Sequence, residues 1–188
     1  MKNNLSLKPI LYGRTINLRP ITVADAPAMF ASLSDAESMR LTGTTETFTY
    51  EQVEQFCQKI SQAANRVDYA ITLKDDPAYI GEAVLNEIDW EAKTADFRIA
   101  LGSSAYFGKG YGTEATQLII HHGLYTLGLE RITLEVYDFN PRAQHVYKKL
   151  GFAQNNVLPN ALCWEGNYHD ALVMNVTKET FTPKENYG

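Results

Sequence analysis

Residues 107–115 read Phe107-Gly108-Lys109-Gly110-Tyr111-Gly112-Thr113-Glu114-Ala115, with three glycines at alternate positions. They separate a strand-like segment, 95–101, from a segment with apolar residues at helical spacing, about 110–127. Glycines let the backbone approach a ligand closely, and the free N–H groups and positive dipole end of a helix start favour an anion such as pyrophosphate. The spacing is neither GxGxxG nor GxxxxGK[ST], so dinucleotide and Walker sites are disfavoured. The stretch predicts an anion site, the alternative being a plain helix-entry turn.

A second motif follows at residues 140–152, which read NPRAQHVYKKLGF. Asn140 can cap a helix, Pro141 suits the first helical position, and Gly151 can end the helix in a left-handed conformation. Tyr147 falls on the apolar stripe of this helix, so its spacing alone favours a core tyrosine over a catalytic one. Asn140 alone is likewise more often only a cap. Every feature of the motif can therefore be structural.

Apolar patterns along the rest of the chain predict an α+β fold with helices on a mixed sheet. Before the glycine stretch we expect helices opening near residue 22 and over 50–64, and strands at 15–21, 69–73, 79–88 and 95–101. The last three of these strands form an antiparallel meander. After the glycine stretch we expect a helix over about 110–127, a strand at 131–136, a helix over about 140–150, and closing strands at 152–158 and 168–176. The β-α-β run should cross over with the right hand.

The composition is that of a folded globular protein. The 188 residues suit one domain spanning 1–188, with a core at about 10–178 and polar ends at 1–9 and 182–188. Hydrophobic residues make up 45% of the chain and charged residues 21%. The net charge of −5 disfavours nucleic-acid and anionic-membrane partners and slightly favours cationic ones. No apolar run reaches the roughly 18 residues of a membrane span, and no signal peptide is indicated, so we expect a cytoplasmic protein.

Metal and disulfide chemistry is not indicated. Cys57 and Cys163 are far apart and belong to no CxxC motif, so we expect two inert buried thiols and no metal cofactor. No triad or metal-ligand pattern surrounds the four histidines, for which we expect packing or surface roles: His121, His122, His145 and His169.

Together, and in this order, the two motifs resemble the GNAT superfamily of acetyl-CoA-dependent N-acetyltransferases. RTINLRPIT at 14–22 and IGEAVLNEIDW at 80–90 fit the order of elements in that family. Within it, the chain is most similar to the ribosomal-protein N-terminal (alanine) acetyltransferase branch. Phe107 stands where the family usually carries Gln or Arg, although an aromatic residue is familiar in that branch, and Ala143 replaces a Ser. The resemblance implies a mostly antiparallel sheet flanked by helices, with an acyl-CoA-binding βα loop.

The resemblance also implies a mechanism and a set of site residues. An amine would attack the acetyl thioester directly, giving a tetrahedral oxyanion that loses CoA thiolate. A backbone N–H on 99–101 would stabilise the oxyanion, Asn140 would contact the pantetheine, and Tyr147 would be the general acid, against its local interpretation. The cofactor-binding residues implied are Ile99, Ala100, Leu101, Phe107, Gly108, Lys109, Gly110, Tyr111, Gly112, Thr113, Asn140 and Tyr147.

The general base is less clearly indicated by the sequence. Asp96 shares a strand face with Arg98 and Ala100 and falls where the ribosomal-protein branch often carries a Glu. It is our candidate base or amine-orienting carboxylate, with a role as a solvated partner of Arg98 rated equal. Glu82 is a second candidate, acting through water.

A protein N-terminal amine is the leading acceptor, and a small amine such as a polyamine or an aminoglycoside is the alternative. A non-catalytic CoA-binding sensor and, more distantly, a nucleotide phosphotransferase are the remaining alternatives. We expect acceptor identity to depend on residues 34–49 and 155–168, and the protein to be a monomer or a homodimer.

Overall fold

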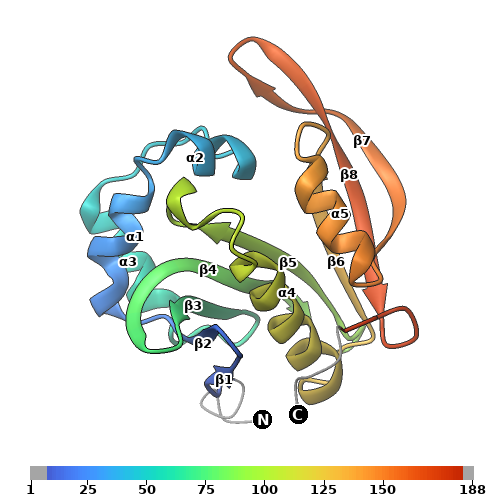
Figure 1. The fold of residues 1–188 in the computed structure, drawn as a ribbon, viewed down its shortest axis with the longest axis horizontal. Helices are drawn as coiled ribbons and strands as arrows, with labels where there is room; N and C mark the ends of the chain where they lie inside the picture. Colours follow the sequence, from blue (N-terminus) through green and yellow to red (C-terminus); the bar gives the residue numbers. More distant parts are fainter. Residues whose placement is uncertain (1–7, 184–188) are drawn as a thin grey trace.

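In the computed structural model, which describes residues 8–183, one sheet of eight strands runs through the molecule (Figure 1). Its order is β1-β2-β3-β4-β5-β6-β8-β7, and only β5 and β6 are parallel. The strands are β1 (Leu11–Tyr12), β2 (Ile16–Pro20), β3 (Val67–Leu73), β4 (Asp76–Asp89), β5 (Thr94–Leu101), β6 (Arg131–Tyr137), β7 (Ala153–Trp164) and β8 (Asn167–Thr177). The predicted mixed, mostly antiparallel α+β fold and its central meander are confirmed.

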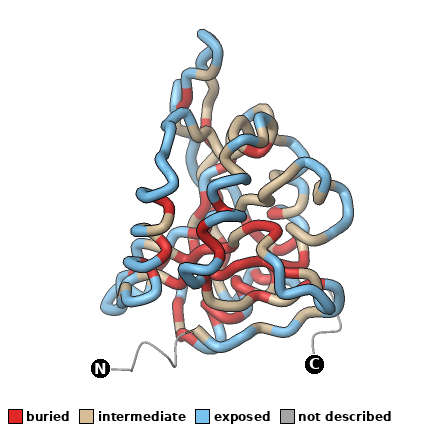
Figure 2. The backbone as a smooth tube through the Cα atoms, turned by 90° about the vertical axis from the view of Figure 1, so that its left-hand side faces the viewer, coloured by how far each residue is buried: buried red, intermediate tan, exposed pale blue. Residues whose placement is uncertain are grey.

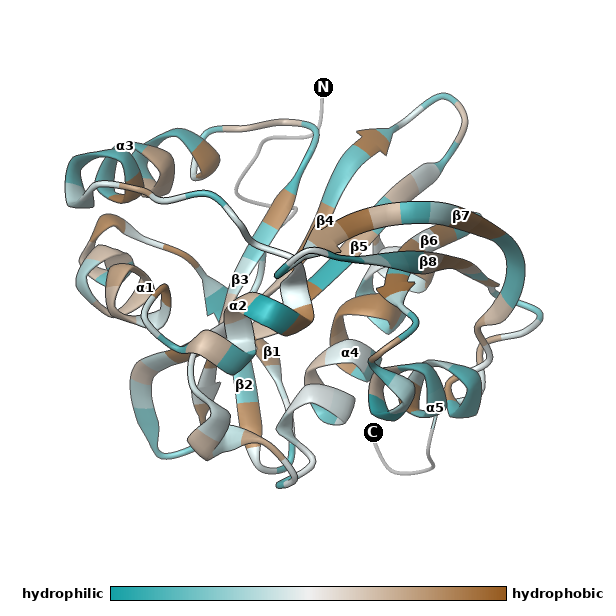
Figure 3. Ribbon diagram, turned by 90° about the horizontal axis from the view of Figure 1, so that it is seen from above, coloured by the Kyte–Doolittle hydropathy of each residue, from teal (hydrophilic) through white to brown (hydrophobic). Residues whose placement is uncertain are grey.

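Helices cover both faces of the sheet (Figure 3). On one face lie α1 (Ala26–Ser32) and α3 (Tyr50–Ile60), and on the other lie α4 (Tyr111–His121), a π-helical turn (His122–Thr126) that extends it, and α5 (Pro141–Lys149). Alternation along the strands produces the two layers. Leu18 and Ile71 pack with the α4 side, whereas Ala70 packs with α1 and α3.

Strands β5 and β6 separate part of the way along their length. Their pairing covers only Thr94–Asp96 and Arg131–Thr133, although β5 continues to Leu101 and β6 to Tyr137. β4 stays paired with β5 as far as Leu101, and β8 stays paired with β6 as far as Tyr137. The β6-facing backbone groups of residues 97–101 therefore have no strand partner within the described chain, and they border an opening in the sheet.

The largest differences from the sequence prediction are at β1, which was not predicted, at α2 and in the β7–β8 hairpin. Helix α2 (Ala36–Thr42) falls in a stretch for which we predicted no helix, capped by Asp35 and ended by the left-handed Gly43. Strands β7 and β8 are longer than predicted because two register shifts absorb the polar and proline-containing residues between Gln154 and Leu162. Their hairpin projects beyond the rest of the molecule with a mostly exposed surface (Figure 2).

The cysteines and histidines largely fill the roles expected of them. Cys57 is buried and Cys163 is exposed, so the expectation of two buried thiols is wrong for Cys163. His122 is buried with its ring edge-on to Tyr69, and His169 pairs with Asp138. Within residues 8–183, no helix is long and apolar enough to cross a membrane, and no group of three or more potential ligand side chains could hold a metal ion. The polar ends, 1–7 and 184–188, lie outside the described residues.

Candidate active site

The glycine stretch forms the entry to helix α4. Gly108 and Gly110 have φ angles of 75° and 83°, in the left-handed region that favours glycine. A Cβ added at Gly108, Gly110 or Gly112 would have no neighbouring atom within 4 Å. The backbone at the start of α4 therefore faces open space with no side chain to shield it. This is the arrangement that lets the free N–H groups of a helix start bind an anion.

A buried carboxylate fixes the position of this helix start. Glu114, in the first turn of α4, is 6% exposed. Its carboxylate accepts hydrogen bonds from the backbone N–H groups of Arg14 and Thr15, the second at 2.9 Å, and from the Thr15 hydroxyl. The turn between β1 and β2 thus holds the first turn of α4 in place, and the negative charge suits the positive end of the helix dipole.

A cleft of about 660 Å³ runs from the glycine stretch into the opening between β5 and β6. Of the residues expected to bind the cofactor, only Lys109 is absent from its lining, and the Lys109 side chain is exposed. Sequence reasoning missed the contribution of β6 (133–137), of Arg142 and Val146 on α5, and of α2. The β6 and α5 residues lie next to predicted ones, whereas the only signal for α2 was its caps, Asp35 and Gly43.

Tyr147 is both a core residue and a cleft residue. Its side chain is 9% exposed, and its ring packs edge-on against Phe97, with centroids 6.2 Å apart. It also lines the cleft, and its hydroxyl has no hydrogen-bond partner among the described residues. Burial raises the pKa of the Tyr147 phenol above its ordinary value near 10, so the hydroxyl keeps its proton at neutral pH. The group can act as a proton donor to a ligand in the cleft.

The start of α5 forms another part of the cleft wall. Asn140 caps the helix as predicted, its side-chain oxygen accepting from the Ala143 N–H at 3.1 Å. Its side-chain NH₂ has no hydrogen-bond partner in the described part of the chain and is left to donate to a ligand. Phe107 lies under the Arg142 guanidinium, 5.7 Å from the ring centroid, so the aromatic residue joins the glycine stretch to α5.

A second pocket, of about 730 Å³, lies next to the first. Most of its lining comes from helices α1, α2 and α3 and from residues 43–48. The rest comes from β4, β5, Arg66 and Gly102. It belongs to the α1–α3 face of the sheet, whereas the glycine stretch and α4 lie on the opposite face. The two cavities share the residues Ser38, Thr42, Arg98, Ala100 and Leu101, so they meet at the end of β5.

Glu82 lies in the second pocket beside this meeting point. It pairs with Ala100 across β4 and β5, and its carboxylate accepts from the Arg98 guanidinium at 3.1 Å. The Glu82 side chain is 13% exposed, against 53% for Arg98. Burial raises the pKa of the Glu82 carboxyl above its ordinary value, and the Arg98 charge opposes part of that rise. A carboxylate with a raised pKa is suited to accept a proton near neutral pH.

Asp96 occupies a different place. It lines the cleft rather than the second pocket, at the last paired position between β5 and β6. Its side chain is exposed, and burial of the carboxyl, with a smaller effect of Glu87, raises its pKa. The alternative role as a partner of Arg98 is wrong, because Arg98 pairs with Glu82.

Helix α2 is fixed over the junction of the two cavities. Asp35 accepts from the Ser38 N–H and from the Ser104 N–H, each at 2.9 Å, and these donors lower the pKa of Asp35 to about 2. The Ser38 hydroxyl donates to the Leu101 carbonyl at 2.8 Å. The helix is therefore tied at its start to the end of β5.

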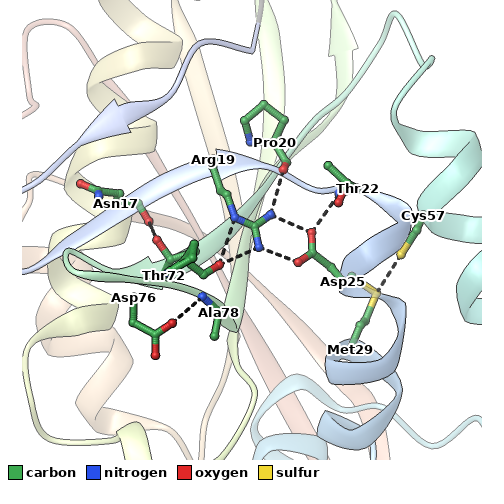
Figure 4. Close-up of polar contacts among 11 residues, drawn as sticks. Asn17, Arg19, Pro20, Thr22, Asp25, Met29, Cys57, Thr72, Asp76 and Ala78 are labelled. Atoms are coloured by element: carbon green, nitrogen blue, oxygen red, sulfur yellow. Dashed lines mark hydrogen bonds and ion pairs between the residues drawn. The ribbon is translucent and has the colours of Figure 1, made fainter.

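Helix α1, which supplies Met29 to the second pocket, is anchored in turn to β2 (Figure 4). Arg19 donates to both carboxylate oxygens of Asp25, at 2.8 and 2.6 Å, and to the Pro77 carbonyl at 2.9 Å. Asp25 also accepts from the Thr22 N–H. Because Asp25 directly precedes α1, this bidentate ion pair fixes where α1 leaves the sheet.

The chain is similar to known proteins. The family description "Acetyltransferase (GNAT) domain" matches residues 15–153. An uncharacterized N-acetyltransferase p20 of Bacillus licheniformis is 27% identical over 176 residues, covering 91% of this chain and 97% of that protein. The spermidine N(1)-acetyltransferase of Escherichia coli K12 is 26% identical over 162 residues, covering 86% of each chain.

Solved structures agree on the fold. The spermidine N-acetyltransferase of Vibrio cholerae, crystallised with CoA and spermine, has a TM-score of 0.82 at 20% identity, covering 88% of this chain and 97% of that one. An acetyltransferase of Bacillus anthracis has a TM-score of 0.77 at 20% identity, covering 91% and 99%. Since the family match spans β2 to the start of β7 and so includes both motifs, the chain belongs to the GNAT acetyltransferases and is an acetyl-CoA-dependent N-acetyltransferase.

Proposed function

We propose that this enzyme acetylates a primary amine of a small cationic molecule of the polyamine class. The observation that carries the proposal is the position of Glu82, a mostly buried carboxylate in a pocket that meets the cofactor cleft at Ala100 and Leu101. An amine in the second pocket would approach the reacting end of acetyl-CoA across this shared wall. The carboxylate beside that wall is suited to receive the proton of the amine.

The cleft residues fit acetyl-CoA, which would supply an activated acetyl thioester. The open backbone at Gly110 and Gly112 suits a pyrophosphate, and the unpaired edge of residues 97–101 suits the amides of the pantetheine. The free NH₂ of Asn140 offers one further donor to the same arm. We assign these residues to cofactor binding. Lys109, which is exposed and outside the lining, is assigned no contact there.

Two side chains would move protons. An alkylammonium with a pKa near 10 must lose a proton before it can attack, and Glu82 accepts that proton on a carboxylate oxygen. We favour Glu82 over Asp96 because Asp96 lines only the cofactor cleft. The Tyr147 hydroxyl donates its proton to the departing sulfur, and the second proton that the nitrogen loses as the amide forms restores that hydroxyl, so Glu82 keeps one proton to release to solvent. A backbone N–H on 99–101 stabilises the negative charge that develops on the acetyl oxygen.

The choice of a small amine is supported by the named relatives. Two proteins similar to this chain over most of its length are spermidine acetyltransferases, and the net charge of −5 favours cationic ligands. A protein N-terminal amine, including that of a ribosomal protein, is the second candidate. A protein acceptor, without regard to which of its amines reacts, is supported by similarity to the human alpha/beta-tubulin-N-acetyltransferase 9, which is 22% identical over 161 residues.

Thiol release from acetyl-CoA, with mass spectrometry of the products, tests the proposal against one panel. The panel holds spermidine, 1,4-diaminobutane, an aminoglycoside and ribosomal-protein N-terminal peptides. We expect acetylation of the polyamines, abolished or strongly reduced in Glu82→Gln. Selective acetylation of a peptide α-amine would overturn the proposed substrate class and would leave the proposed mechanism of acetyl transfer in place. Acetyl-CoA binding without thiol release for any amine would instead favour a sensor.

A further inference from the structure

The charges of the second pocket do not balance among themselves. Four charged side chains line it, and three of them have partners. Arg66 donates to both oxygens of Asp68, at 2.8 and 2.7 Å, and Arg98 donates to Glu82 at 3.1 Å. The fourth, Glu46, has no ion pair or hydrogen bond among the described residues. With Asp68 counted, the pocket keeps one unpaired negative charge.

The two carboxylates of the pocket lie at different depths. Glu82 is mostly buried at the wall shared with the cofactor cleft, whereas Glu46 is exposed, in the connection between α2 and α3. That connection is held at both ends. Gly43, in the left-handed region, packs so closely on the Tyr137 ring that a Cβ would lie 2.4 Å from its hydroxyl oxygen. Thr49 and Gln52 form reciprocal capping bonds at the start of α3.

Much of the remaining lining is apolar. It includes side chains from α1, α3 and the connection before α3, namely Met29, Leu33, Phe48, Val53 and Phe56. Such a surface favours methylene groups by excluding water. An acceptor suited to this pocket has an amine at its inner end, an alkyl body, and a second positive charge toward the opening.

We propose that Glu46 is a specificity-determining residue that attracts a second cationic group of the acceptor. This inference rests on the proposed function. Glu46 is exposed, and exposed ion pairs are weak, so removing its charge should change the affinity by up to about 5-fold. The enzyme should therefore prefer diamines and longer polyamines over monoamines of equal length, and the preference should weaken as salt screens the charge.

The test compares kcat and KM for 1,4-diaminobutane and butylamine, which share a four-carbon chain and differ in one amine. We expect Glu46→Gln to raise the KM for the diamine about 3- to 5-fold, with kcat unchanged and with butylamine unaffected. Glu46→Lys, which reverses the charge, should raise it further. The matched control is Glu51→Gln, an equal change of charge in the first turn of α3, outside both cavities.

The possible results separate a failure of the Glu46 inference from a failure of the proposed function. Acetylation of both amines with equal effects of Glu46→Gln on each, or with no effect on the diamine, would overturn the inference alone. The inference would also be overturned if Glu51→Gln raised the KM for the diamine as much as Glu46→Gln does. If the wild-type enzyme acetylated no amine, the proposed function and the inference would both fall. Thermal unfolding of each variant checks that the fold is retained.

Discussion

The two cavities on either side of β5 are built in different ways. The cleft proposed to bind the cofactor contains two stretches of exposed backbone, namely the bare glycine turn before α4 and the edge of β5 that β6 leaves unpaired. The second pocket is formed by side chains from α1, α2, α3 and residues 43–48. A co-substrate common to a family can be bound through backbone geometry, which requires specific glycines. An acceptor that differs between enzymes is bound through side chains that leave no motif.

The two cavities are nevertheless mechanically joined. Ser38 on α2 donates to the Leu101 carbonyl at the end of β5, and both residues line both cavities. Variants away from this junction should separate cofactor affinity from acceptor affinity, and variants at the junction should affect turnover.

Glu82→Gln should have the largest effect, because it keeps the shape of the side chain and removes the proton acceptor. We expect kcat/KM for the amine to fall about 10²- to 10³-fold. The dissociation constant of acetyl-CoA should change little, since Glu82 does not line the cleft. Steady-state kinetics and calorimetric titration measure the two quantities. A larger loss in Asp96→Asn than in Glu82→Gln would place the base on the cofactor side instead.

Tyr147→Phe removes the hydroxyl and keeps the ring that packs on Phe97. We expect kcat to fall about 10²-fold, because the departing sulfur loses its proton donor. Stability should change little, since the hydroxyl has no hydrogen-bond partner in the described chain. Turnover and thermal unfolding measured on one preparation check both expectations. Unchanged turnover would remove Tyr147 from the chemistry.

Gly112→Ala tests the backbone cradle without left-handed strain, because only Gly108 and Gly110 of this turn have positive φ angles. We expect the affinity for acetyl-CoA to fall about 10-fold as the methyl group enters the space that a ligand would fill. Stability should rise by about 0.5–1 kcal/mol, because Ala favours a helix over Gly.

The control for that variant is Gly128→Ala, which lies outside both cavities and has a φ of 77°. It should lower stability and leave acetyl-CoA affinity unchanged. Wild-type affinity in Gly112→Ala would show that the ligand does not approach the start of α4.

Arg98→Gln should move the acidic limb of the kcat/KM profile to higher pH. In the proposed mechanism Glu82 acts in its ionised form, so activity should be lost as the pH falls through its raised pKa. The Arg98 charge opposes that rise, and its removal leaves a still higher pKa. Both enzymes are measured with the same amine substrate at saturating acetyl-CoA. The titration of the amine then affects both pH profiles equally and does not contribute to the difference between them. Lys74→Gln, an equal loss of charge in an exposed turn, should leave the limb in place, and a limb unmoved by Arg98→Gln would contradict the assignment of Glu82.

Asp35→Ala should have the smallest effect, removing the cap of α2 and its tie to Ser104. We expect a loss of about 0.5–2 kcal/mol in the free energy of unfolding at pH 7. Because the pKa of Asp35 is about 2 in the folded protein, its contribution is present above the ordinary range near 4 and is lost as the pH falls toward 2. Denaturant unfolding of both proteins at pH 7 and pH 3 should show a smaller difference at pH 3.

The sequence predicted the lining of the cleft better than the lining of the second pocket, for a physical reason. The left-handed Gly110, the capping Asn140 and the left-handed Gly151 each follow from local backbone requirements, which a sequence states directly. The short helix α2 owes its position to contacts with β5 that are distant in sequence, such as Ser38 with Leu101. No residue of 155–168 lines either cavity, although we expected acceptor contacts there as well as at 34–49.

Hydrogen exchange measured by mass spectrometry, with CoA alone and with spermidine alone, tests the separation of the two cavities most directly. CoA should slow exchange at residues 107–113 and leave residues 43–49 unchanged. Spermidine should slow exchange at 43–49 and leave 107–113 unchanged. Protection of 43–49 by CoA with none at 107–113 would contradict the assignment of the glycine turn to the cofactor and of the second pocket to the acceptor.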